Sequence, residues 1–525
     1  MRNRFALLPL AVVLAAPAVG RTQDHQHADE LGNVTFPTSC NAEAQSRMNR
    51  AVAMLHSFWF PEARKTFESV LAADASCGIA HWGIALTHFG NPMAGGSAAP
   101  GQAAGAAAAR MAAQVGATDA RDGAYIDAAV ALYRDHATVD NRTRMIAYQS
   151  SMNGIVAQFP EDTEAKIFDA LFTVATAPPT DLTFAQQKRA AKTLTALYRD
   201  RPKHPGLAHY IIHAFDSPPL AVLALDAARQ YAGIAPAAPH ALHMPSHIFT
   251  RLGYWDESIS TNRRSADLEP TPGGKAHPLD YMVYAYLQQG RDEAARKAIE
   301  EIGGNTSGEY IAGTLGSYNA LAMPARYSLE RDDWATAAAL KITAATPSAE
   351  AVTHVARGLG AARSGQTALA RQEVAALEKL VADLVAQKDT YWSHVVDAQR
   401  MAVSAWAAHA EGRHAEAAAL ARAAADKEEQ VEKHPVTPGP LIPARELLGD
   451  LLMAHNQPAA ALEAYEVTLK KEPNRARTLT GAARAAKAVG NREAAKRYYA
   501  AVVAVMDRAS TRPELREATQ FVAQR

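Results

Sequence analysis

Self-similarity at a constant spacing of about 34 residues is the feature that most constrains this chain. Near the C-terminus, Ala461 and Tyr465 recur at this spacing as Ala495 and Tyr499, with Gly490 at a turn. After residue 40 apolar residues recur at spacings of three and four, which is typical of helices, and we find no alternating strand pattern. Such a unit cannot bury its apolar face alone, so neighbouring units must stack. The sequence therefore predicts an all-α array of helix hairpins.

The same spacing recurs upstream, where Ala51, Ala63 and Phe67 occupy equivalent positions. Small residues at these positions let paired helices approach closely, and the aromatic residue fills the gap to the next unit. The pattern resembles the tetratricopeptide repeat (TPR). This resemblance implies a right-handed α-α superhelix, a solenoid of TPR-like hairpins, whose first helices line a concave groove.

The repeats divide the 525 residues into six segments. Loops are expected at 90–108, which contains Asn91-Pro92 and Gly95-Gly96, and at 174–184. The predicted segments are a signal peptide at 1–20, an extended segment at 21–40, TPR-like hairpins with a Gly/Ala-rich loop at 41–110, a central array with a His-rich groove at 111–300, divergent helical repeats at 301–440 and C-terminal TPR repeats at 441–525.

The N-terminus has the pattern of a secretory signal. Arg2 and Arg4 precede an apolar run at 5–16, and small residues suitable for cleavage follow it. The run is too short to span a bilayer comfortably. We therefore expect a periplasmic or secreted protein without stable membrane insertion.

The charge balance argues against a nucleic-acid partner. Lys and Arg number 54, as do Asp and Glu, so the formal net charge is zero. General binding to a phosphate backbone depends on clustered cations.

Two cysteines, Cys40 and Cys77, are expected to pair. Residues 44–56 and 61–73 read as an antiparallel helix pair, with Cys40 before the first helix and Cys77 after the second. Both cysteines then lie at one end of the hairpin, and an exported chain meets an oxidising compartment. Two separate buried thiols are the alternative.

Two neighbouring units carry histidines in register. His209 and His213 are four residues apart, so they share one helix face, and they recur at the repeat spacing as His243 and His247. The TPR resemblance implies that these positions face the groove. The next unit follows at a step of 37 residues, which relates His240 to His277. Three rows of equivalent positions then appear: His209, His243 and Asp280; His213, His247 and Tyr284; His240 and His277.

This pattern is typical of a metal site. Two histidines one helical turn apart can hold one ion, and a third from the next helix would leave an open position. We predict a divalent metal, Zn, Cu or Ni, with Asp280 either as a ligand or as a residue that orients a histidine. The predicted ligands are His209, His213, His240, His243, His247, His277 and Asp280. A metal-free groove that recognises an acidic peptide, and histidines that only pack and hydrogen-bond, are the alternatives.

Further residues fall near groove positions. Tyr284 belongs to the second row, and His56 could extend the site or pack in the core. The dipeptide Met323-Pro324 repeats Met244-Pro245, and this alignment places Arg326 at the position of His247. Arg326 could meet an anionic ligand or form a salt bridge to a neighbouring helix. Proline at 245 and 324 should bend both first helices.

Several blocks resemble those of exported bacterial TPR proteins, among them 55–60, 209–213 and 243–248. The resemblance implies the fold and export but no reaction. We find no P-loop and no nucleophile elbow. The predicted function is therefore a scaffold that binds a protein or peptide in its groove, with a divalent metal at the histidines. A metal-dependent, hydrolase-like enzyme and purely structural histidines remain the alternatives.

Overall fold

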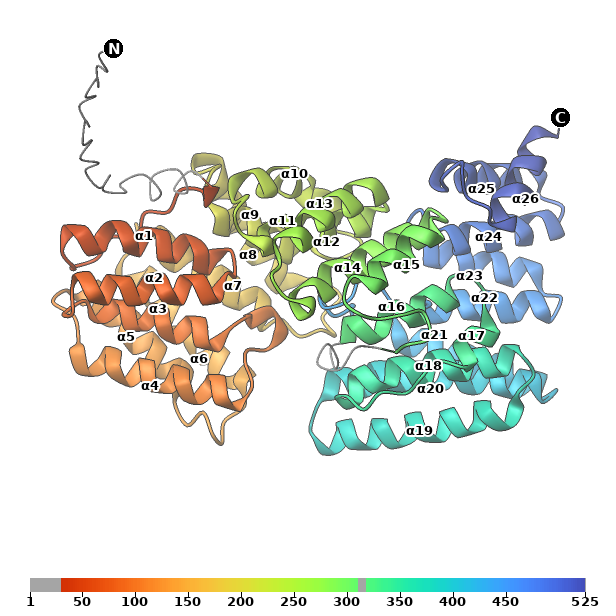
Figure 1. The fold of residues 1–525 in the computed structure, drawn as a ribbon, viewed down its shortest axis with the longest axis horizontal. Helices are drawn as coiled ribbons and strands as arrows, with labels where there is room; N and C mark the ends of the chain where they lie inside the picture. Colours follow the sequence, from red (N-terminus) through yellow and green to blue (C-terminus); the bar gives the residue numbers. More distant parts are fainter. Residues whose placement is uncertain (1–29, 310–317, 525) are drawn as a thin grey trace, which may run out of the picture.

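The computed structural model describes residues 30–309 and 318–524, and within these ranges every regular element is helical. The helices pair into antiparallel hairpins that stack on their neighbours (Figure 1). The predicted fold class, an α-α superhelix of TPR-like hairpins, is confirmed. The predicted signal peptide at 1–20 lies outside the described residues.

The N-terminal stack covers the first third of the chain. Side chains at helix starts satisfy backbone donors there: Asn41, Asp119, Asp140 and Asp162 each accept from an N–H of the first turn. The helices are α1 (Ala42–His56), α2 (Phe60–Ala73), α3 (Gly78–Phe89), η2 (Pro92–Ala94), α4 (Ala99–Val115), α5 (Ala120–Tyr133), α6 (Asn141–Gln158), α7 (Thr163–Ala175) and α8 (Ala185–Asp200).

The loop predicted at 90–108 is shorter than expected, because α4 begins at Ala99. The alanine-rich composition favours a helix despite its glycines. At Gly105 a β-carbon would lie 2.0 Å from the Tyr133 hydroxyl, so glycine is needed for the close packing of α4 and α5. The loop at 174–184 does separate α7 from α8.

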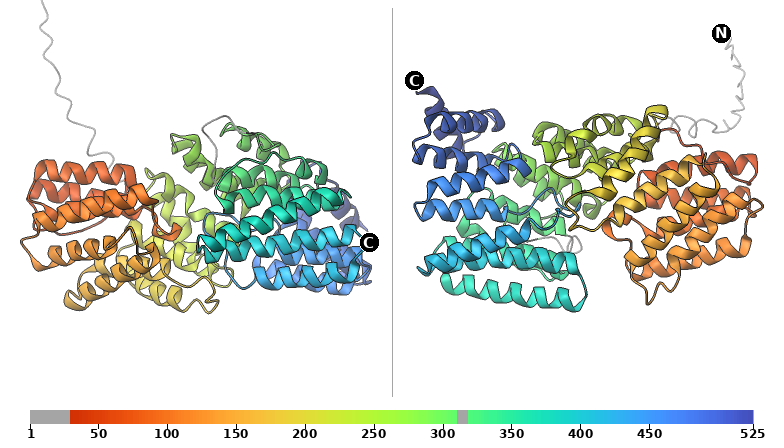
Figure 2. Two further views of the ribbon diagram at one scale, coloured as in Figure 1. Left: turned by 90° about the horizontal axis from the view of Figure 1, so that it is seen from below. Right: turned by 180° about the vertical axis from the view of Figure 1, so that it is seen from behind.

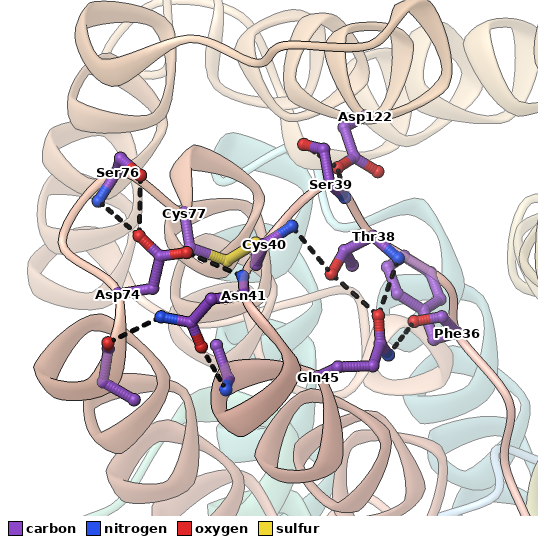
Figure 3. The surroundings of a disulfide bond; sticks show 12 residues. Phe36, Thr38, Ser39, Cys40, Asn41, Gln45, Asp74, Ser76, Cys77 and Asp122 are labelled. Atoms are coloured by element: carbon purple, nitrogen blue, oxygen red, sulfur yellow. Dashed lines mark hydrogen bonds between the residues drawn. A yellow bond between two sulfur atoms is a disulfide. The ribbon is translucent and has the colours of Figure 1, made fainter.

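A disulfide joins Cys40 to Cys77, with 5.2 Å between their Cα atoms, at the end of the α1–α2 hairpin (Figure 3). The Asp74 carboxylate accepts from the Asn41 backbone N–H (2.8 Å) beside it. The preceding extended residues are anchored as well, since Phe36 is fully buried and stacks on Trp82 at 5.2 Å.

The central helices contain the predicted histidine rows. Pro245 cannot donate a backbone hydrogen bond, and the expected bend is a break between α11 and α12. Pro324 lies inside an unbroken helix, α16. The central helices are α9 (Pro205–Phe215), η3 (Ala221–Ala224), α10 (Leu225–Ile234), α11 (Pro239–His243), α12 (Pro245–Leu252), α13 (Trp255–Leu268), α14 (Pro272–Gln288) and α15 (Asp292–Glu300).

The C-terminal stack folds back beside the central helices (Figures 1 and 2). The Trp255 indole N–H donates to the Asn474 carbonyl at 3.0 Å across this contact. The helices are α16 (Tyr318–Leu329), α17 (Trp334–Ala338), α18 (Pro347–Arg363), α19 (Thr367–Ala386), α20 (Thr390–Ala410), α21 (His414–Glu428), α22 (Ala444–Ala454), α23 (Pro458–Lys471), α24 (Ala476–Ala488), α25 (Arg492–Val505) and α26 (Pro513–Ala523).

The chain's own residues 432–440, between α21 and α22, run across the first helices α14 and α16. The Tyr281 hydroxyl donates to the carbonyls of Pro435 (3.2 Å) and Thr437 (3.1 Å), and Asn319 donates to Val436 (2.6 Å). This 432–440 segment therefore occupies the face where the sequence predicted an external peptide.

None of the described helices combines the length and the apolar composition needed to cross a membrane.

Candidate metal centre

Six histidines of the three predicted rows meet in two adjacent groups. In each group the closest ring nitrogens all lie within 4.8 Å of one another. Each group combines two histidines four residues apart with a third from the next first helix, as the spacing suggested. Site A consists of His209 and His213 on α9 with His240 on α11, and site B consists of His243 on α11, His247 on α12 and His277 on α14.

The two sites adjoin each other. The ring centroids of His213 and His247 are 6.1 Å apart, and those of His240 and His243 are 6.0 Å apart. The shared helix α11 carries one histidine of each site, because a spacing of three residues places His240 and His243 on one helix face. The two sites therefore form one histidine centre between α9 and α14.

Hydrogen bonds fix the orientation of the site B rings. The Asn262 amide donates to the Ser258 carbonyl (2.8 Å), so its oxygen faces His243 and accepts from His243 Nδ1–H (2.6 Å). His247 Nδ1–H donates to the Asp216 carboxylate (2.8 Å). Both rings thus carry their proton on Nδ1 when neutral, and their Nε2 lone pairs face each other at 3.0 Å.

Site A is oriented in the same way. His209 Nδ1–H donates to the backbone carbonyl of His56 (2.6 Å), which can only accept. His209 Nε2 therefore carries a lone pair, and it lies 3.1 Å from His240 Nε2. His213 Nε2 is buried without a hydrogen-bond partner among the described residues.

The environment favours neutral rings. Burial first, and then the neighbouring His277 and His247 rings, hold the pKa of His243 well below its usual value. Burial also lowers the pKa of His247, although Asp216 opposes it. Burial likewise sets the low pKa of His209, His213, His240 and His277. Neutral imidazole is the form that binds metals.

Asp216 is a buried carboxylate that was not among the residues predicted from the sequence. It accepts from Arg251 Nε (2.9 Å) and Lys433 Nζ (3.3 Å) as well as from His247. Burial opposes its ionisation, but Lys433 and Arg251 hold the pKa of Asp216 well below its usual range. Asp216 directly follows α9 and lies three residues beyond His213, and this closeness in sequence was the feature that could have identified it.

His56 belongs to a different group, which is complete without a metal. Glu164 accepts from His56 Nε2–H (2.7 Å) and from His204 Nε2–H (2.9 Å). The Tyr210 hydroxyl donates to His56 Nδ1 (3.0 Å), and the Leu207 N–H donates to His204 Nδ1 (3.4 Å). Every ring nitrogen thus has a partner, and His56 is a core residue that supports site A through its carbonyl.

Asp280 and Arg326 lie away from the histidines and form a salt bridge of 2.9 Å, with both side chains fully buried. Arg326 also donates to the carbonyls of Gly439 and Pro440, each at 2.8 Å. Asp280 is therefore a partner of Arg326 and not a metal ligand. Arg326 was expected either to meet an anionic ligand or to form a salt bridge to a neighbouring helix. The structure has the salt bridge, and the 432–440 segment occupies the space beside the guanidinium where a ligand would lie.

Tyr284 also faces the interior. Its hydroxyl donates to Glu472 (3.2 Å) and accepts from Arg475 (3.1 Å), and the residue is fully buried. The fold-back of the C-terminal stack brings these partners close, so Tyr284 does not line an open groove. Sequence alignment of the rows could not reveal these partners, because they lie 188 and 191 residues further along the chain.

One open cleft reaches the histidine centre. It has a volume of about 730 Å³ and runs between the N-terminal stack and the start of α20. His213 and Asp216 line it, together with Ser217 and Gln187, whose Oγ and Oε1 atoms are buried without partners in the described structure. Site A is therefore the part of the centre that a small molecule could approach.

Comparison with known proteins identifies no family: no protein-family model matches the chain, and no curated protein matches it. The TPR domain of P58(IPK) is a similar solved structure, with 14% identity, a TM-score of 0.21 and coverage of 69% of this chain and 98% of that chain. The APC/C hetero-tetramer Cut9-Hcn1 has 12% identity, a TM-score of 0.33 and coverage of 92% of this chain and 96% of that chain. The human IFIT1 dimer with m7Gppp-AAAA has 10% identity, a TM-score of 0.41 and coverage of 95% of this chain and 100% of that chain. At these identities and TM-scores they carry no information about ligand or partner.

Proposed function

We propose that this protein is an exported TPR-like scaffold that holds two transition-metal ions, of the copper, zinc or nickel class, in sites A and B. The observation that carries the proposal is the pair of Nε2 atoms of His243 and His247, 3.0 Å apart, with both Nδ1–H groups already donated elsewhere. Two lone pairs at this distance repel unless a cation or a proton lies between them.

A divalent metal ion fits this arrangement, because it can bind both lone pairs at once together with the third imidazole of the group. Burial lowers the pKa of both rings, so neither ring gains a proton readily near neutral pH. The Asp216 carboxylate beside His247 supplies a negative charge close to such an ion. The six proposed ligands are all imidazoles, the donor that suits Zn, Cu and Ni.

The residues around the ligands support the same function. Histidines that bind a metal usually donate their other ring N–H to a carboxylate or carbonyl, which fixes the tautomer. Asp216, Asn262 and the His56 carbonyl accept these bonds from His247, His243 and His209. Three histidines at each site would leave a position open for a further ligand.

Metal-dependent catalysis, hydrolytic in type, is the second candidate function. The cleft that reaches His213 favours it, since Ser217 and Gln187 offer polar atoms without partners beside the centre, among the described residues. A protein or peptide partner would have to enter by this cleft, because the 432–440 segment covers the face of α14 and α16. In either case the metal ions are the first property to test.

The test is the metal content of untagged protein, measured by elemental mass spectrometry after purification and after incubation with Zn²⁺, Cu²⁺ or Ni²⁺. His247→Gln keeps a donor for Asp216 but removes a lone pair, so it should lose the site B ion and retain the fold. His213→Gln should lose the site A ion.

His204→Gln is the matched control, because it removes a buried histidine from a group that is complete without a metal. It should lower stability and leave the metal content unchanged. Protein that takes up none of the three ions at sites A and B, or that binds them equally well after both ligand substitutions, would refute the proposal.

A further inference from the structure

A further group of histidines lies in the C-terminal stack, at the ends of helices α20, α21 and α22, which Figure 1 labels. We propose that His409, His414 and His455, called site C, bind a third divalent transition-metal ion, independently of sites A and B and in open exchange with solvent. The closest ring nitrogens of these residues all lie within 4.8 Å of one another. They lie outside the histidine rows predicted from the sequence.

Three helix ends bring the site together. His409 lies in the last turn of α20, His414 is the first residue of α21, and His455 follows the last residue of α22. The α20–α21 turn contains Gly412 at φ 78°, which reverses the chain within three residues and places His414 beside His409. The next repeat then places His455 against both.

The geometry is that of converging ligands. The ring centroids are 5.3 Å apart for His409 and His414, 5.0 Å for His409 and His455 and 4.9 Å for His414 and His455. His409 Nδ1 lies 3.0 Å from His455 Nε2. Within the described ranges no main-chain group or carboxylate is hydrogen-bonded to these rings, so each retains a nitrogen for an ion.

The nearest acidic residue in the sequence is already engaged with other partners. A carboxylate close by in sequence, Glu411, forms salt bridges with Arg371 and Arg413. An ion at site C would therefore have imidazole ligands, with water completing its coordination.

Accessibility distinguishes site C from the central sites. His414 is exposed and the other two rings are partly exposed, whereas sites A and B each combine two buried histidines with one that is partly exposed. An ion at site C can exchange directly with chelators in solution. An ion at site A could leave only by the cleft that reaches His213, and an ion at site B would be held by two buried histidines. The structure thus predicts one rapidly exchanging ion beside slowly exchanging ones.

The test uses the full chain without a tag, first stripped of metal and then titrated with Zn²⁺ by calorimetry. His414→Ala with His455→Ala should lose one binding equivalent relative to the wild type, and the remaining equivalents should be unchanged. His136→Ala, which removes a partly exposed histidine outside every group, is the matched control and should lose none. Equal numbers of equivalents in the wild type and the double variant would overturn the proposal.

A second measurement needs no substitution and so does not depend on the folding of a variant. Carbethoxylation of histidines, mapped by mass spectrometry, should be slowed by Zn²⁺ at His409, His414 and His455 but not at His136. Unchanged modification of site C under saturating Zn²⁺ would overturn the proposal. Loss of site C alone leaves the metal content of sites A and B unaffected, so the two proposals fail separately.

Discussion

Replacing Asp216 by asparagine tests how the histidine centre is held. Asp216 accepts from His247 Nδ1–H at 2.8 Å, from Arg251 Nε at 2.9 Å and from Lys433 Nζ at 3.3 Å. Asparagine has the same shape but no charge, and its amide group can accept through one oxygen only. The substitution therefore removes the counter-ion of two buried cations and loosens the orientation of one proposed ligand.

The cost to the metal-free protein follows from these contacts. Removing one partner of a buried ion pair costs about 3–5 kcal/mol. Arg251 keeps Glu432 at 3.0 Å, and burial has already lowered the pKa of Lys433 to about 8, so Lys433 can lose its charge. We therefore expect a loss near the lower end, about 3 kcal/mol in the free energy of unfolding.

The cost to metal binding is separate. Loss of a residue that orients a ligating histidine typically weakens metal affinity by about 10–100-fold, which corresponds to about 1.4–2.7 kcal/mol. Without Asp216, the His247 ring can rotate or move its proton to Nε2, the atom that would bind the ion. We expect weakening at site B and an unchanged site A.

The assay combines urea unfolding of metal-free protein with Zn²⁺ titration. Glu373→Gln is the matched control, because Glu373 accepts from His354 Nδ1 (2.6 Å) and Arg357 Nε (2.7 Å) in a similar buried arrangement away from the centre. It should lower stability and leave affinity intact. If Asp216→Asn destabilises the protein as expected but binds Zn²⁺ as tightly as the wild type, the proposed role of Asp216 in orienting His247 is wrong.

Three further predictions concern pH and the fold. The buried histidines of sites A and B have lowered pKa values in the folded protein, so the free energy of unfolding should be retained above pH 6.5 and fall below it. The expected loss is about 1.4 kcal/mol per pH unit for each histidine that stays neutral in the folded state. Unfolding free energies that do not change between pH 7.5 and 5.5 would contradict this. The disulfide closes a loop with a sequence separation of 37, so Cys40→Ser with Cys77→Ser should cost about 4 kcal/mol in urea unfolding under oxidising conditions. Arg475→Met leaves Glu330 and Glu446 buried without their shared partner and should cost about 3–5 kcal/mol, and an unchanged melting temperature would argue against that ion network.

Much of the centre followed from the sequence because its ligands are encoded by short-range periodicity. Histidines four residues apart share a helix face, and a regular repeat places equivalent faces side by side. This reasoning grouped His209 with His213 and His243 with His247, and it expected a third histidine from the next helix. The prediction of Asp280 as a metal ligand failed, because alignment of the repeats gives the position of a residue on its helix but not the side chain that it contacts.

The residues that sequence reasoning missed are those whose partners lie far along the chain. Glu164 bonds to His56 across 108 residues, Asp216 bonds to Lys433 across 217, and site C joins residues of two different repeats. A local sequence pattern cannot reveal contacts between residues so far apart in the chain. The loop expected at 90–108 proved shorter for a different reason, since glycines within an alanine-rich run can pack against a neighbouring ring and remain helical.

The sequence by itself determined the helices, their hairpin pairing and the face on which the histidines lie, because these depend on the helical turn and on a repeat length that varies by only a few residues. Only the tertiary structure decided that the array folds back on itself and that residues 432–440 cover the face of α14 and α16. It also decided that Arg326 and Tyr284 point into the interior. The curvature that accumulates over many repeats sets these contacts, and small differences in packing between neighbouring helices determine it.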